Sequence, residues 1–134
     1  MAFWLLKTEP SVYSYEDLER DKKTVWDGVG NNTALKHLRS MKKGDLVFIY
    51  HSGDEKCIVG IAEIVSRPYP DPQKNDPRFV VVDLKAKKRL KNTVSLANVK
   101  ARKAFEDFAL VRIPRLSVMP VSPAQWKTLL TMSD

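Results

Sequence analysis

Two glycines bracket a short segment that follows a tryptophan, in the run WDGVGN at Trp26–Asn31. Glycine opens backbone conformations that are closed to other residues and lets main-chain groups approach a ligand closely. An indole beside such a turn can stack on a flat ring, or it can plug the end of a sheet. The pattern therefore fits a pocket for a flat heterocycle, and the residues alone leave both roles open for Trp26.

Further polar and aromatic residues stand where apolar runs end, at Lys7–Glu9, Tyr50–Ser52 and Arg115–Ser117. A base held outside its stack needs an aromatic face and a few fixed donors and acceptors at its edge. These segments supply such groups as an indole, a phenol, short hydroxyls, a carboxylate and glycine-rich backbone. The candidate base-pocket residues are Thr8, Glu9, Trp26, Gly28, Val29, Asn31, Tyr50, His51, Ser52 and Ser117.

The charge balance favours an anionic partner, because 23 Lys and Arg stand against 16 Asp and Glu, a formal net charge of +7. Nucleic acid is the commonest such partner. Lys7 and Arg115 could hold the phosphates that flank a bound base. A membrane surface is a less favoured partner, because the sequence predicts no long helix that pairs a basic face with an apolar one.

Alternation over residues 79–90 predicts a strand with a second basic surface. Its apolar face holds Val80, Val82, Leu84 and Ala86. Its other face holds Lys85, Lys87, Arg89 and Lys91. This face could contact a nucleic-acid backbone, but a solvated surface that protects a sheet edge explains it as well and is favoured.

Enzyme motifs are missing from the sequence. It holds no phosphate loop, dinucleotide fingerprint or nucleophile elbow. One cysteine and two histidines, Cys57, His37 and His51, do not make a usual zinc site. We therefore predict no catalytic residue, no metal and no cofactor.

Cysteine content indicates the cellular compartment, and the length of the apolar runs indicates whether the chain can span a membrane. Cys57 lies in an apolar run, so a buried thiol in a reducing cytoplasm is expected. The apolar stretch at residues 2–6 is too short for a signal peptide, and no run approaches the ~20 apolar residues of a membrane span.

Short elements of both kinds predict one α+β domain over residues 1–134. Strands are expected at 2–8, 46–51, 57–65, 79–90, 110–113 and 116–121, and a loop at 25–30. Ser14 to Asp17 fits a capping box, Asn31 or Asn32 can cap a helix that runs to about 41, and Ser122-Pro123 can begin a last helix. A further helix is expected at 95–103. Trp4 and Trp126 are assigned to the core.

Four separated motifs resemble the EVE-domain family: Trp4–Pro10, Trp26–Asn31, Gly44-Asp45 with Tyr50–Ser52, and Arg115–Val121. The resemblance covers nearly the whole chain. It implies a PUA-like fold, a curled mixed β-sheet or barrel with short flanking helices. It also implies a non-catalytic monomer that binds DNA or RNA and recognises a modified base such as 5-methylcytosine.

One residue departs from the family pattern: the family usually has Arg where this chain has Gly30. The substitution removes a bidentate donor from the expected pocket mouth. Fold analogy also leaves open an accessory factor or enzyme of RNA modification, or a module that binds a small ligand or a protein.

Overall fold

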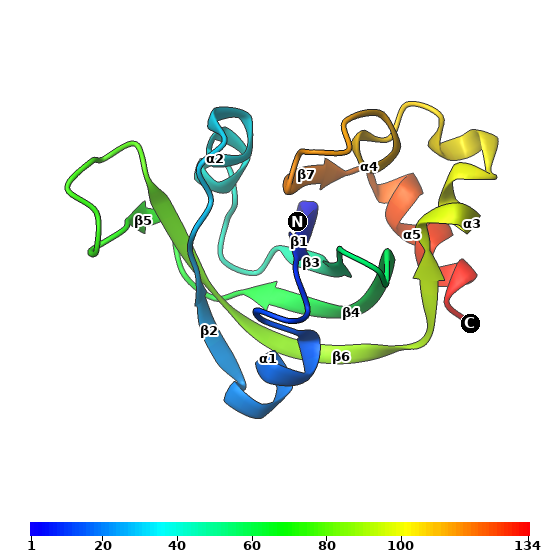
Figure 1. Cartoon of the computed structure of the whole chain (residues 1–134), viewed down its shortest axis with the longest axis horizontal. Helices are drawn as coiled ribbons and strands as arrows, with labels where there is room; N and C mark the ends of the chain where they lie inside the picture. Colours follow the sequence, from blue (N-terminus) through cyan, green and yellow to red (C-terminus); the bar gives the residue numbers. More distant parts are fainter.

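Seven strands form one curled sheet in the computed structural model, which describes residues 1–134 (Figure 1). Six strands follow the order β2-β6-β4-β3-β1-β7, and β5 pairs with β6 off this path. The strands are β1 (Phe3–Thr8), β2 (Lys23–Trp26), β3 (Leu46–His51), β4 (Cys57–Ile64), β5 (Tyr69–Pro70), β6 (Val80–Ser95) and β7 (Val118–Val121).

The sheet is mixed because β1 and β3 run parallel, whereas the other pairs are antiparallel. Parallel neighbours need a long connection. The chain between β1 and β3 supplies it with α1 (Tyr15–Asp21), β2 and α2 (Asn32–Arg39). The predicted α+β fold on a curled mixed sheet is confirmed.

The helices begin at the predicted caps. Ser14 and Asp17 form a capping box at α1, Asn31 caps α2, and Ser122 with Gln125 forms a second box at α5 (Pro123–Met132). The C-terminal part of the chain adds α3 (Leu96–Lys100), the 3-10 turn η1 (Lys103–Phe105) and α4 (Ala109–Arg112).

Two predicted elements were wrong. The strand expected at 110–113 is the short helix α4, because a brief apolar run carries too little periodicity to separate strand from helix. The helix expected at 95–103 is divided between α3 and η1.

The predicted basic face of β6 was also wrong. The pairing of β6 with β4 slips between the pairs Ala62–Ala86 and Ile61–Lys88, which leaves Lys87 as an extra residue. A one-residue slip moves every later side chain to the opposite face of the sheet. The residues predicted to share a face, Lys85, Lys87, Arg89 and Lys91, are therefore divided, with Lys85 and Arg89 on opposite sides.

The buried apolar side chains form one cluster that contains all three tryptophans. Trp126 stacks on Phe48 with ring centroids 3.8 Å apart, and on Phe3 at 4.6 Å. Trp4 is buried in the same cluster, so the core assignment of Trp4 and Trp126 is confirmed. No helix reaches the length and apolar character that crossing a bilayer requires.

Candidate functional site

An open cleft of about 720 Å³ lies where the ends of β1 and β2 meet the loop before β7. We call it the Trp26 cleft. The residues predicted for ligand contact that line it are Lys7, Thr8, Glu9, Trp26, Gly28, Val29 and Ser117. Its other lining residues are Val12, Tyr13, Thr24, Val25, Asp27 and Gly30. The structure thus brings three of the four sequence motifs to one hollow.

Main-chain hydrogen bonds between strands position the residues that line the cleft. The Lys7 N–H donates to the Ser117 carbonyl over 2.9 Å, which ties the end of β1 to the segment before β7. Trp26 pairs with Val82 as the last residue of β2. Trp26 was predicted to lie in a loop, and that was wrong, because pairing with distant β6 extends β2 to this residue. Its side chain is 8% exposed, and that small exposed part borders the cleft.

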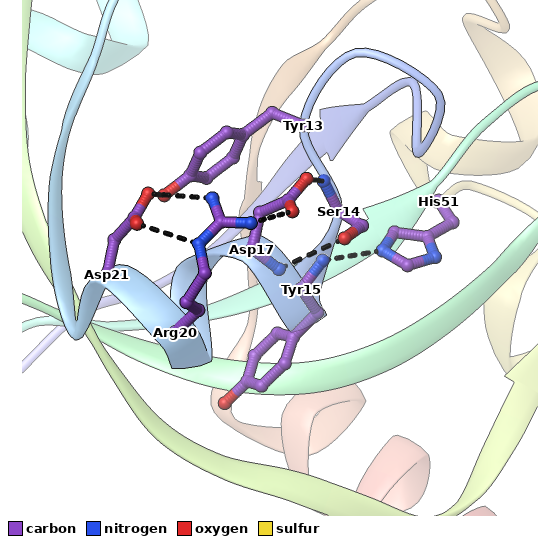
Figure 2. Close-up of polar contacts among 7 residues, drawn as sticks. All are labelled: Tyr13, Ser14, Tyr15, Asp17, Arg20, Asp21 and His51. Atoms are coloured by element: carbon purple, nitrogen blue, oxygen red, sulfur yellow. Dashed lines mark hydrogen bonds and ion pairs between the residues drawn. The ribbon is translucent and has the colours of Figure 1, made fainter.

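Tyr13 is a wall residue that the sequence reading missed. Its ring meets the Trp26 indole edge-on, with centroids 6.4 Å apart and planes at 83°. Its hydroxyl donates to Asp21 Oδ2 over 2.8 Å, and Figure 2 shows Arg20 lying between Asp21 and Asp17. Helix α1 therefore fixes the orientation of the phenol. An aromatic residue directly before an N-cap is a common packing position, but that signal does not point to a cleft.

Lys7 brings positive charge to the cleft wall. Its Nζ donates to the Pro114 carbonyl over 2.7 Å and lies 5.6 Å from the centroid of the Tyr50 ring. Burial lowers the pKa of the Lys7 ammonium, because desolvation disfavours the charged form. The structure thus holds a partly desolvated cation in the wall of the cleft, where it can pair with an anionic ligand.

Five predicted site residues lie outside the cleft lining: Asn31, Tyr50, His51, Ser52 and Arg115. Tyr50 is 3% exposed and lies behind Lys7. The Ser52 hydroxyl donates to the Thr8 carbonyl over 3.2 Å, and the Asn31 side-chain oxygen Oδ1 accepts from the Ala34 N–H over 3.0 Å. Arg115 is exposed. Contact of these residues with a ligand stays a prediction.

His51 joins the hairpin of β3 and β4 to helix α1. The Tyr15 main-chain N–H donates to His51 Nε2 over 2.9 Å, as Figure 2 shows. Nε2 must therefore carry a lone pair, so the proton lies on Nδ1, which is 2.9 Å from Glu55 Oε1. The His51 side chain is 8% exposed. These contacts give His51 a structural role at the start of α1.

We expect His51→Ala to lower the free energy of unfolding by about 2–3 kcal/mol, because it leaves the buried Tyr15 N–H without an acceptor. Urea denaturation followed by circular dichroism measures the change. Glu55→Gln is the control, since its amide oxygen still accepts from Nδ1 and the Nε2 contact is untouched. Equal stability of His51→Ala and the parent would contradict this role.

Two of the five basic side chains of β6 are paired with carboxylates. Lys87 Nζ lies 3.3 Å from Glu63 Oε1, and the Arg89 guanidinium pairs with Glu19 of α1. Arg89 also lies over the Tyr15 ring. Each pairing reduces the charge that remains for phosphate. Lys85 is exposed and unpaired, and its contact with a nucleic-acid backbone stays a prediction.

Comparison with known proteins decides the family. The family model described as the EVE domain matches residues 2–132. The chain belongs to the EVE-domain family. Among curated relatives, thymocyte nuclear protein 1 of Rattus norvegicus is 32% identical, over 98% of this chain and 74% of that protein.

Solved EVE-family structures share the fold. Rpa0253 from Rhodopseudomonas palustris is 45% identical with a TM-score of 0.94, over 99% of this chain and 93% of that one. Human THYN1, solved in complex with DNA that contains 5-methylcytosine, is 29% identical with a TM-score of 0.90, over 100% and 98%. The resemblance of the sequence motifs to the EVE family is confirmed.

Proposed function

We propose that this EVE domain is a non-catalytic nucleic-acid-binding module that takes one flipped, modified base, such as 5-methylcytosine, into the Trp26 cleft. The observation that carries the proposal is the cleft itself, which combines the Trp26 and Tyr13 rings, glycine-rich backbone and the Lys7 cation. Its relative human THYN1 has been solved with DNA containing that base, which supports the same ligand class here.

The cleft offers the two kinds of contact that a flipped base needs. Stacking on an aromatic side chain contributes about 1–3 kcal/mol per base and tolerates any sequence. Recognition of the base edge requires fixed donors and acceptors. The main chain from Gly28 to Gly30 lines the cleft and can supply them, and φ of +77° at Gly28 holds a turn that side-chain-bearing residues rarely adopt.

Gly30 leaves room at the mouth of the cleft. No heavy atom lies within 4 Å of the position that a Cβ at residue 30 would occupy, and the backbone there has no positive φ. The Cβ of the arginine that the family usually carries would therefore meet no clash at this position. Its absence shifts phosphate contact in this chain to other cations, of which Lys7 is the one held in the cleft.

The domain acts as a monomer in this proposal, because one chain supplies every wall of the cleft. The buried Cys57 thiol fits a reducing compartment such as the cytoplasm.

Binding to a panel of oligonucleotides tests the function. Matched DNA and RNA strands with one cytosine, either methylated or unmodified, are titrated by fluorescence anisotropy at about 50 and 200 mM salt. We expect affinity to fall with salt, and a preference of about 10- to 200-fold for the methylated strand, the range for one methyl in an apolar slot.

Two outcomes would contradict the proposal. The first is no binding to any strand at the lower salt. The second is conversion of the modified nucleoside during incubation with the protein, detected by mass spectrometry, which would contradict its non-catalytic part. The DNA and RNA arms of the panel identify the preferred nucleic acid.

A further inference from the structure

Four cations gather in a second groove, of about 660 Å³, between the end of α2 and strand β5. We call it the basic groove. Its charged lining residues are Arg39, Lys42, Lys43 and Arg67. No carboxylate lines it, and Met41, Pro68, Tyr69, Pro70 and Val80 complete its walls. A concave surface lined by charges of one sign concentrates ions of the opposite sign.

These four side chains remain free to bind an anion. All four residues are exposed, and none forms an ion pair. Arg39 donates from one Nη to the Arg78 carbonyl, which leaves its other donors unused. Lys87 and Arg89 on β6 are instead paired with carboxylates. Unpaired positive charge thus lies at the basic groove, which the sequence reading did not single out.

The basic groove connects to the Trp26 cleft across the surface. Gly28, Val29 and Gly30 line both the cleft and a small pocket of about 160 Å³, and Val80 lines both that pocket and the basic groove. Helix α2 begins two residues after Gly30 of the cleft lining and ends at Arg39, which lines the basic groove. Its eight residues span about 12 Å, which corresponds to roughly three or four nucleotide steps along a duplex.

The surface between the two hollows is also cationic and aromatic. The small pocket contains Phe79, with Arg78 Cζ 4.5 Å and Lys74 Nζ 5.5 Å from its ring centroid. Asp71 is the one carboxylate in the pocket lining, and it is buried and accepts the Gln73 N–H. Arg78 also pairs with the exposed carboxylate of Asp76 over 3.8 Å, so Lys74 is the cation of this path that has no carboxylate partner.

Tyr69 adds no negative charge to the basic groove. Its hydroxyl donates to Asp83 Oδ1 over 2.6 Å, and this hydrogen bond raises the pKa of Tyr69 to about 12. The phenol stays neutral at physiological pH, and its hydrogen bond occupies a carboxylate oxygen of Asp83 beside the groove.

We propose that Arg39, Lys42, Lys43 and Arg67 bind phosphates of the nucleic-acid strand that continues from a base held in the Trp26 cleft. This inference rests on the proposed function. It assigns two separate tasks: the cleft recognises the base, and the basic groove holds the backbone without reading sequence.

A charge-matched pair of variants tests the assignment. The groove variant combines Arg39→Gln, Lys42→Gln, Lys43→Gln and Arg67→Gln. The control variant combines Lys100→Gln, Arg102→Gln, Lys103→Gln and Arg112→Gln, which are exposed and line neither hollow. Both remove four positive charges, two from Lys and two from Arg. Affinity for a methylcytosine oligonucleotide is measured against salt for each.

We expect the groove variant to flatten the slope of log K against log salt by about 3 and to weaken binding about 10- to 1,000-fold at 0.1 M salt. Its loss should be equal for methylated and unmodified strands, because phosphates carry no base information. The control variant should retain most of the parent slope.

Equal slopes for the two variants would overturn the groove assignment and leave the proposed function intact. Absence of oligonucleotide binding by the parent would remove both proposals. The parent protein is also titrated with polyglutamate. If it binds polyglutamate more tightly than the oligonucleotide, and the groove variant loses that binding, the groove binds an acidic protein and the assignment is overturned. Thermal melting checks that each variant folds. If the fourfold groove variant does not fold, a double variant with Lys43→Gln and Arg67→Gln replaces it and is expected to flatten the slope by about 2.

Discussion

Asp45→Ala is expected to lower the free energy of unfolding by about 3–5 kcal/mol. The carboxylate is 3% exposed and accepts three hydrogen bonds. Its Oδ1 accepts from the Ala2 N–H over 3.1 Å, and its Oδ2 accepts from Trp4 Nε1–H and the Lys42 N–H, both over 2.9 Å. Alanine leaves three donors without their acceptor: the Trp4 Nε1–H, which is buried and costs about 1–3 kcal/mol, and two main-chain N–H groups in part-buried contacts, which add to the loss.

Urea denaturation measures this loss, with Asp54→Ala as the matched control. Asp54 is exposed in the loop between β3 and β4, so its replacement should change the unfolding free energy by less than about 0.5 kcal/mol. The result that contradicts the role of Asp45 is a loss no larger than that of the control.

Trp26→Ala should have two separable effects. Removal of a buried indole typically costs about 3–5 kcal/mol of unfolding free energy. Loss of the stacking face should also weaken oligonucleotide binding by about 1–3 kcal/mol, or roughly 5- to 150-fold. Thermal melting measures the first effect, and binding by anisotropy, well below the lowered melting temperature, measures the second.

Trp126→Ala separates the two effects of Trp26→Ala. Trp126 is buried to a similar extent, at 6% exposed, but packs on Phe3 and Phe48 away from the cleft. It should lose comparable stability and keep its affinity. Trp26→Phe retains a flat ring and should bind between the parent and Trp26→Ala. Equal affinity of folded Trp26→Ala and Trp126→Ala would show that the base lies elsewhere.

Helix starts were predictable because their hydrogen bonds close within three or four residues. Ser14, Asn31 and Ser122 accept from main-chain N–H groups three positions later, so sequence spacing alone specifies them. The core positions of Trp4 and Trp126 followed from apolar neighbours. The family motifs located most of the cleft lining, although they could not separate residues that face it from those behind it.

The role of Asp45 could not be predicted from its neighbours in the sequence. The sequence marks it as part of a turn after Gly44, yet its main partners lie 41 and 43 positions away, at Trp4 and Ala2. Likewise, β3 ends at His51 as predicted, but hydrogen bonds and packing against β1 and α1 hold Tyr50, His51 and Ser52 outside the cleft lining.

Local residue patterns specify the capping of helices α1, α2 and α5, the glycine-rich turn and the family, and composition specifies the positive charge. Tertiary structure alone decided that Trp26 belongs to a strand, that Tyr13 faces it, and that a slip at Lys87 divides the β6 cations. It also brought Arg39 and Arg67, 28 positions apart in the chain, into one groove. The physical reason is that pairing register and the packing of α2 on the sheet depend on partners distant in sequence, which no local spacing encodes.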